Sequence, residues 1–174
     1  MAHTAQRLFF ESVKEQLPQY FTGVKVLDCG SLDVNGKLKD FFTHSDYVGV
    51  DITSGANVDI VSKIHELDLP SQSFDTVVSG EMLEHDEHWR ESLLKIYSLC
   101  QEGGLIAISC AGEGRAEHGT VRSGDILYGT SPDYYMNLLP SHFREVYKED
   151  MFEDSEVFGM NEDTYFYGIK KIND

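Results

Sequence analysis

The chain has 174 residues, of which 30 are acidic and only 14 are lysine or arginine, so its formal net charge is −16. Proteins that bind nucleic acids neutralise phosphates with lysine and arginine, so this balance disfavours DNA or RNA as a substrate. No apolar run reaches the length of a membrane span, and the first residues lack a secretory pattern. We therefore expect a cytoplasmic protein without membrane contact, folded as one domain over 1–174.

Three cysteines, Cys29, Cys100 and Cys110, lie far apart in the sequence. An odd number without the short spacing of zinc ligands is typical of buried thiols in a reducing compartment. We expect neither a disulfide framework nor a metal site.

Apolar periodicity and turn residues predict alternating helices and strands in the first half of the chain. The expected elements are a helix within 6–21 that frays at Pro18, a strand at 24–29, a short helix at 37–42, and strands at 47–52, 58–61 and 76–79. This alternation is typical of a parallel α/β sheet.

The alternation continues with a helix at 87–100 and an almost continuously apolar strand at 105–110. A loop rich in glycine and charge is expected at 111–130, and Ser131-Pro132-Asp133 has the residue types of a helix start. The helix is expected to continue to Leu139.

Two strands, at 144–147 and 164–170, complete the predicted elements. No helix is expected between them, so they most simply form an antiparallel pair at one edge of the sheet. We expect the acidic stretch 149–163 to be a solvated loop.

The most informative pattern is a carboxylate at the end of each of the first two strands. Asp28 and Gly30 end the first, and Asp51 ends the second. Parallel strands joined by one crossover end at the same edge of the sheet, where a glycine turn and a diol-binding acid form a nucleoside site. Taken singly, Gly30 reads as a turn glycine and Asp51 as a helix cap.

These motifs resemble those of the class I S-adenosylmethionine-dependent methyltransferases, nearest to the small-molecule group sometimes called type 11. The matching segments are Val26-Leu27-Asp28-Cys29-Gly30, Gly49-Val50-Asp51, 67–75, 79–85 and Glu102-Gly103-Gly104-Leu105. The resemblance implies a Rossmann-like, mostly parallel seven-stranded sheet with helices on both faces and a C-terminal antiparallel strand pair. It also implies S-adenosylmethionine as the cofactor.

The resemblance further implies which residues contact the cofactor. Those near its methionine, ribose, adenine and methyl portions would be Asp28, Cys29, Gly30, Ser31, Asp51, Ile52, Ile64, His65 and Ser79. The sequence departs from the family at Leu32 and Val34, where glycines are usual, and at Lys63, where an acid often binds adenine. Adenine would then be held by backbone amides or by His65.

A nicotinamide-binding domain is the main alternative. It is disfavoured because Gly30 lacks the G-x-G-x-x-G continuation that binds a pyrophosphate. S-adenosylmethionine has no phosphate, so it depends less on such a loop.

Candidate catalytic residues follow the fourth and fifth strands. His118 is the first candidate general base because histidine titrates near neutral pH. Glu117 or Glu113 is expected to orient it, and Glu81 is the second candidate for contact with the acceptor. Arg115 is suited to an anionic substrate group. The alternative is a lid whose polar side chains face solvent.

Other residues near this edge have two readings each. His85 either faces the pocket or caps the following helix, and we favour the cap. Tyr134 and Tyr135 either form a wall of the substrate pocket or belong to the core.

The expected reaction is methyl transfer to oxygen or nitrogen of a small molecule or glycan-type acceptor. Residues 79–82 lack the Asn/Asp-Pro-Pro-aromatic tetrad of enzymes that methylate amino groups of bases or glutamine, and no cysteine follows a proline. Two alternatives stay open: a module that binds S-adenosylmethionine or its demethylated product without turnover, and a subunit completed by a partner. The sequence does not indicate the oligomeric state.

Overall fold

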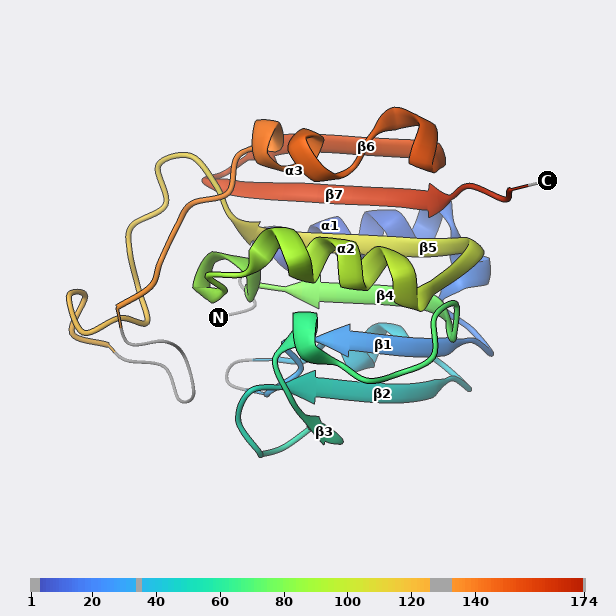
Figure 1. Cartoon of the computed structure of the whole chain (residues 1–174), viewed down its shortest axis with the longest axis horizontal. Coiled ribbons are helices and arrows are strands. Elements are labelled where there is room, and N and C mark those ends of the chain that lie inside the picture. The colour runs from blue at the N-terminus through green and yellow to red at the C-terminus, as the bar shows by residue number, and fades with distance from the viewer. Residues whose placement is uncertain (1–3, 34–35, 126–132, 174) are drawn as a thin grey trace.

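The computed structural model describes residues 4–33, 36–125 and 133–173. Seven strands form one sheet in the order β3-β2-β1-β4-β5-β7-β6 (Figure 1). The strands are β1 Lys25–Cys29, β2 Asp46–Asp51, β3 Ile60–Val61, β4 Phe74–Gly80, β5 Cys100–Ala111, β6 Phe152–Met160 and β7 Asp163–Lys170.

The sheet is parallel from β3 to β5, and β7 pairs antiparallel with both β5 and β6. The chain proceeds outward from β1 to β3 and then returns to place β4 on the other side of β1. The strand order therefore reverses between β1 and β4, which is where open α/β sheets bind ligands at the carboxyl ends of their strands. The predicted fold class is confirmed.

Helices cover both faces of the sheet. In Figure 1, α2 Trp89–Leu99 and α3 Pro140–Val146 lie in front of the sheet and α1 Thr4–Gln16 lies behind it. Short 3-10 helices occupy the remaining connections: Pro18–Tyr20, Leu38–Phe41, Ile64–Glu66, Leu83–His85 and Glu149–Met151.

Two apolar cores lie on opposite faces of the sheet. Val77 and Phe166 pack in the core that includes α2 and α3, whereas their chain neighbours Val78 and Tyr165 pack in the core that includes α1. Successive side chains of a strand point to opposite faces, so a strand covered on both sides is apolar along its whole length. This explains the continuous apolar runs in the sequence.

The N-terminal helix ends close to Pro18, as expected. The helix α1 ends at Gln16, and Pro18 begins a separate 3-10 turn. Proline lacks the backbone N–H that a continuing helix needs, so the chain leaves the helix here.

The largest corrections fall in the last third of the chain. Residues 134–139 are not helical, and the helix begins instead at Pro140, whose fixed φ suits the first helical turn. The predicted start at Ser131-Pro132 lies outside the described residues, and Asp133 is in a turn. The strand predicted at 144–147 is wrong, because α3 occupies most of it and β6 supplies the partner of β7.

The strand β6 lies in the acidic stretch that was predicted to be a loop. Its residues from Glu153 to Glu156 are exposed, because β6 is the last strand of the sheet and pairs on one side only. Charged side chains at such an edge discourage pairing with another chain. The sequence therefore resembled a solvated loop although the backbone is extended.

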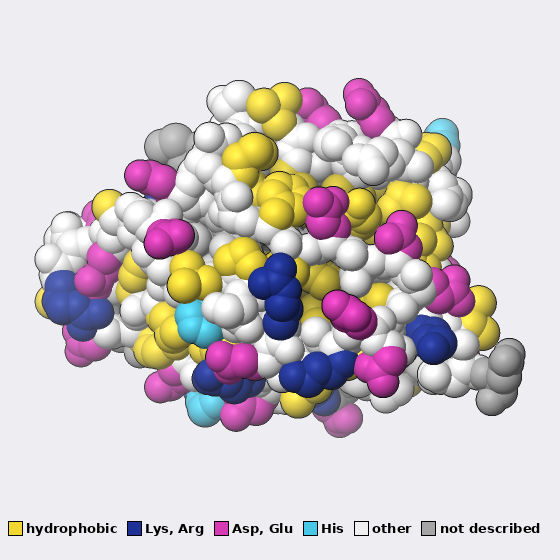
Figure 2. All heavy atoms as spheres, turned by 90° about the horizontal axis from the view of Figure 1, so that it is seen from above, with side chains coloured by type: hydrophobic (Ala, Val, Ile, Leu, Met, Phe, Trp, Pro, Cys, Tyr) yellow, Lys and Arg dark blue, Asp and Glu magenta, His cyan; other side chains and the backbone are white. Residues whose placement is uncertain are grey.

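Acidic side chains are spread over the face shown in Figure 2. On the face shown in Figure 2, lysine and arginine side chains are interspersed with aspartate and glutamate. Within the described residues, no helix has both the length and the apolar character needed to cross a bilayer.

Candidate functional site

The loop after β1 is attached to the end of β2. The backbone N–H groups of Gly30 and Ser31 both donate to the carbonyl of Val50, at 2.8 and 3.1 Å. Gly30 has a φ of +89°, and a Cβ at this position would lie 2.6 Å from Cβ of Met82. The protein's own Met82 therefore excludes a side chain at this position.

Asp28 is a buried carboxyl with one free oxygen. Its side chain is 2% exposed; Oδ2 accepts a hydrogen bond from the Tyr47 hydroxyl, and Oδ1 has no partner among the described residues. Burial raises the pKa of Asp28 to about 7, although the Tyr47 bond opposes the rise. A buried, unpartnered oxygen of this kind fits a cationic group such as the ammonium of a methionine moiety.

Asp51 is only partly buried, at the end of β2. Its two oxygens accept backbone hydrogen bonds from Leu32 at 3.2 Å and from Thr53 at 3.1 Å. Burial raises the pKa of Asp51, and these backbone bonds oppose the rise. Each carboxylate oxygen has two lone pairs, so Asp51 retains the capacity to accept two hydroxyl groups of a ribose. The two carboxyls thus fit the implied cofactor.

Several of the other residues predicted to contact the cofactor have side chains that a ligand does not reach. Cys29 and Ser79 are 0% exposed, and Ser79 Oγ donates to the Cys29 carbonyl at 2.7 Å. Ser31 Oγ donates to the Asn57 carbonyl at 2.8 Å. Such residues are available to a ligand only through their backbone.

The predicted adenine-side residues differ in exposure. Ile64 is buried in the core, whereas Ile52 is 43% exposed. The ring of His65 packs against that of His88, with centroids 4.2 Å apart. Adenine is flat and apolar on its faces, so Ile52 and His65 are the side chains here suited to contact it.

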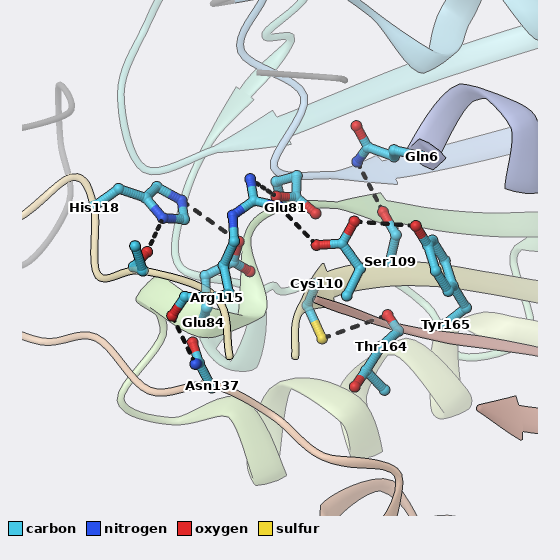
Figure 3. A network of polar contacts seen from close by, with 12 residues as sticks. Gln6, Glu81, Glu84, Ser109, Cys110, Arg115, His118, Asn137, Thr164 and Tyr165 are labelled. Atoms are coloured by element: carbon cyan, nitrogen blue, oxygen red, sulfur yellow. Dashed lines mark hydrogen bonds and ion pairs between the residues drawn. The ribbon is translucent and has the colours of Figure 1, made fainter. Parts of the chain in front are cut away.

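A second polar group lies where β4 and β5 end. Arg115 donates to Asp163 at 2.9 Å and to Glu81 at 3.4 Å (Figure 3), and the Tyr165 hydroxyl donates to Asp163 at 3.0 Å. Arg115 is therefore engaged by two carboxyls of the protein rather than held for an anionic substrate.

Glu81 has an unusual backbone and an unusual charge environment. Its φ is +53°, a left-handed conformation that costs a non-glycine residue energy and that is frequent at functional sites. Burial, and then repulsion by Asp163, raise the pKa of Glu81 to about 7, while Arg115 opposes the rise. Its Oε1 has no partner among the described residues.

His118 lies beside Glu84 rather than beside its predicted orienting residues. Its Nδ1 is 3.1 Å from the Ala116 carbonyl, and its Nε2 is 4.0 Å from Glu84 Oε1. Glu117 instead accepts a hydrogen bond from Thr120 at 2.6 Å and pairs with Arg122 at 2.7 Å. Glu113 is exposed.

Glu84 is fully buried, and sequence analysis missed it. Burial, followed by repulsion from Glu81, raises its pKa well above the ordinary value, and the backbone N–H groups of Glu84 and Ala111 only partly oppose this. The adjacent pair Glu84-His85 was visible in the sequence, but nothing in the spacing linked it to His118.

His85 faces this group and does not cap the next helix. The residue at the N-cap of α2 is His88, and both ring nitrogens of His85 are buried without a partner. Burial, and then the nearby His118, lower the pKa of His85 to about 4. The predicted capping role is wrong, and the His85 ring instead packs beside those of His118 and Tyr135.

Tyr135 completes one side of the group. Its ring centroid lies 5.5 Å from that of His85 and 5.0 Å from that of His118. Its hydroxyl is 3.3 Å from the Ala116 carbonyl, to which it donates. Tyr134 lies elsewhere, with its hydroxyl 3.8 Å from Met136 Sδ.

A mostly parallel seven-stranded sheet with acids at the ends of β1 and β2 and an antiparallel β7 is the architecture of the class I methyltransferases. Residues 27–108 match the family model described as the methyltransferase domain. The resemblance to class I S-adenosylmethionine-dependent methyltransferases is therefore confirmed. A search of curated protein sequences found no match.

Solved structures of low sequence identity share this fold. One is the Burkholderia thailandensis 1,6-didemethyltoxoflavin-N1-methyltransferase with 1,6-didemethyltoxoflavin and S-adenosylhomocysteine bound (18% identity, TM-score 0.66, 97% of this chain and 79% of that chain). Another is Haemonchus contortus phosphoethanolamine N-methyltransferase 2 with phosphomonomethylethanolamine and S-adenosylhomocysteine (18%, 0.67, 94% and 52%). This chain thus spans about half of the second protein.

A third similar structure contains a partner. It is a Haloferax volcanii protein crystallised with the Trm112 methyltransferase activator (13% identity, TM-score 0.60, 95% of this chain and 91% of that chain). At these identities the likenesses establish the fold.

Proposed function

We propose that this chain, acting as one domain, transfers the methyl group of S-adenosylmethionine to oxygen or nitrogen of a small-molecule or glycan-type acceptor. The observation that carries the proposal is the pair of acids at adjacent strand ends. Asp28 has a buried oxygen without a partner, and Asp51 retains lone pairs at a partly exposed position. Together they fit an ammonium and a ribose diol.

The cofactor, when bound, supplies an electrophilic methyl group on a positively charged sulfur. Asp28 would hold the ammonium, Asp51 the ribose hydroxyls, and Ile52 and His65 the adenine. The backbone after β1, including Gly30, would lie against the methionine portion. These contacts would position the methyl group near the ends of β4 and β5, and such positioning is the main contribution of an enzyme to a displacement reaction.

The acceptor would bind at the group formed by Glu81, Glu84, His85 and His118, with Tyr135 as one wall. A hydroxyl or protonated amine must lose a proton to become a nucleophile. His118 and Glu81 are the proposed proton acceptors, because His118 is partly exposed at this edge and the pKa of Glu81 lies near neutrality. Glu117 pairs with Arg122 instead, so we do not propose it as a proton acceptor.

The experiment that tests the cofactor is a calorimetric titration of the purified protein with S-adenosylmethionine and S-adenosylhomocysteine, with NAD as the control. The expected result is saturable binding of one molecule per chain for the first two ligands and none for NAD. Absence of binding for both would overturn the proposal for the isolated chain.

A subunit that needs a partner is the second candidate. It is supported by the similar Haloferax volcanii protein, which was crystallised with an activator, and by the exposed edge strand β6. Cofactor binding and methyl transfer by the purified chain alone would exclude it. Cofactor binding without transfer to any acceptor in a broad panel would instead favour a binding module.

A further inference from the structure

Three side chains of metal-ligating types meet at the acceptor edge, the part of the sheet where β4 and β5 end and where the acceptor is proposed to bind. The ligand atoms of Glu84, His85 and His118 all lie within 4.8 Å of one another. Glu84 and His85 come from the 3-10 turn after β4, and His118 comes from the loop after β5. Figure 3 shows the His118 ring directed toward the Glu84 carboxyl. The proposed transfer reaction does not by itself explain this convergence.

Two of these side chains carry polar atoms that the rest of the described protein does not satisfy. Both carboxyl oxygens of Glu84 and both ring nitrogens of His85 are buried without a hydrogen bond of normal geometry. Buried polar atoms in folded proteins nearly always have a partner, so four such atoms on adjacent residues indicate a missing ligand. A cation accepts a lone pair from a carboxylate and from neutral imidazoles alike.

We propose that Glu84, His85 and His118 bind one divalent transition-metal ion, such as Zn²⁺, and that this ion holds the hydroxyl group of the acceptor. The part that concerns the acceptor rests on the proposed function. The part that concerns the ion does not.

The donor set and the spacing favour this class of ion. Two imidazoles and one carboxylate suit zinc and its first-row neighbours, whereas Mg²⁺ and Ca²⁺ prefer oxygen ligands throughout. Ligand atoms at about 2.1 Å from a tetrahedral zinc ion lie roughly 3.4 Å apart, so the group must close by about an ångström.

Three protein ligands leave a fourth position open, as in catalytic zinc sites. A hydroxyl bound there loses its proton more readily, because a metal ion lowers the pKa of a bound oxygen. The resulting alkoxide still has lone pairs for attack, whereas a metal-bound amine has used its only lone pair. The ion therefore selects oxygen over nitrogen as the methylated atom.

The proton and electrons balance without a further reactant. The acceptor O–H bond breaks and its proton passes to Glu81, whose Oε1 has no partner among the described residues. The oxygen then forms its bond to the methyl carbon as the sulfur–methyl bond breaks, and the sulfur keeps that electron pair. His118 is in this scheme a metal ligand and Glu81 is the proton acceptor.

The test is metal binding by the full chain, measured without any acceptor. Chelator-treated protein is titrated with Zn²⁺ by calorimetry and with Co²⁺ by visible absorption, and Mg²⁺ serves as the comparison ion. We expect one Zn²⁺ or Co²⁺ per chain, an intense tetrahedral Co²⁺ spectrum, and much weaker binding of Mg²⁺. No saturable binding of Zn²⁺ or Co²⁺ would overturn the proposal.

Variants identify the ligands. Glu84→Gln and His118→Ala should each weaken Co²⁺ binding by at least about tenfold, since even residues that only support a metal ligand cost that much. His88→Ala is the matched control, because His88 also lies beside another histidine and a carboxylate but is outside the group. Unchanged Co²⁺ affinity in folded Glu84→Gln and His118→Ala proteins would overturn the assignment.

The two proposals fail in different ways. If S-adenosylmethionine binds but Zn²⁺ and Co²⁺ do not, the ion proposal is wrong and the proposed function stands. If Zn²⁺ binds but S-adenosylmethionine does not, the metal site stands and the proposed cofactor is wrong.

Discussion

Two parts of the same side of the sheet bury carboxyl groups: the proposed cofactor edge, where β1 and β2 end, and the proposed acceptor edge, where β4 and β5 end. The chain assembles the two differently. Asp28 and Asp51 lie at the ends of two strands that pair directly in parallel. At the other edge, Glu84 comes from a 3-10 turn, His118 from a loop and Asp163 from the last strand. The carboxyl groups of the first edge are brought together by one pair of strands, whereas those of the second are brought together only by the assembled sheet.

This difference has a consequence for how the two sites respond to change. At the cofactor edge each carboxyl is held by local hydrogen bonds, such as that from Tyr47 to Asp28. At the acceptor edge the carboxyls repel one another, and Arg115 pairs with two of them, Glu81 and Asp163. We therefore expect substitutions at the first edge to act on cofactor affinity and stability, and those at the second to act on transfer.

The largest effect is expected from His118→Ala. Its removal should lower the rate of methyl transfer about 10²–10⁴-fold, which is the range for a group that helps to remove the proton of the acceptor, and should leave cofactor affinity unchanged. The measurement is release of S-adenosylhomocysteine with an acceptor found by screening. The control is His44→Asn, because His44 is exposed and has a φ of +52°, which asparagine tolerates. Full turnover by His118→Ala would remove this residue from the site.

Gly30→Ala should destabilise the fold by about 2–4 kcal/mol. The new Cβ must adopt a φ of +89° and would lie 2.6 Å from Met82 Cβ, so conformational strain and overpacking add. Gly23→Ala is the matched control, because Gly23 has a φ of +66° with nothing within 4 Å and should cost only about 1 kcal/mol. Chemical denaturation measures both. Equal losses would mean that the contact with Met82 does not constrain the loop.

The buried Asp28 should make stability depend on pH. Its pKa is about 7 in the folded protein against an ordinary value of 3.8. Its contribution is therefore complete below about pH 3.8 and is lost as the pH rises through 7. The Asp28→Asn variant has no carboxyl here and does not lose stability in this way. Between pH 4 and 8, without cofactor, the free energy of unfolding of the variant relative to that of wild type should therefore rise by about 2–4 kcal/mol. A constant difference across that range would contradict the burial of the charge.

Asp51→Ala should weaken binding of S-adenosylmethionine by about 1–3 kcal/mol, through the lost hydrogen bonds to the ribose. Calorimetry measures the change. Asp46→Ala is the matched control, because Asp46 is an exposed residue at the opposite end of the same strand and should leave affinity unchanged. An Asp51→Ala protein that is folded and binds with wild-type affinity would show that the ribose is placed elsewhere.

Much of the fold was predictable because its signals are local. The strand from Lys25 to Cys29 and that from Asp46 to Asp51 are short apolar runs ended by acids, and the structure places them within a residue or two of the prediction. The helix at Trp89–Leu99 has a clear apolar stripe. The last third of the chain was predicted less well: β6, for example, has exposed charged residues that resemble a loop until β7 is present to pair with it.

By itself, the sequence determined the parallel α/β sheet, the resemblance to class I methyltransferases and the two acids at the ends of β1 and β2. These signals are local, because they depend on strand periodicity and on the short separation in sequence between the two strands. Only the tertiary structure decided which groups meet at the acceptor edge. It replaced Glu117 by Glu84 as the carboxyl beside His118, turned His85 toward that group and engaged Arg115 with Asp163. These contacts join residues far apart in the chain, so they exist only once β4, β5 and β7 lie side by side.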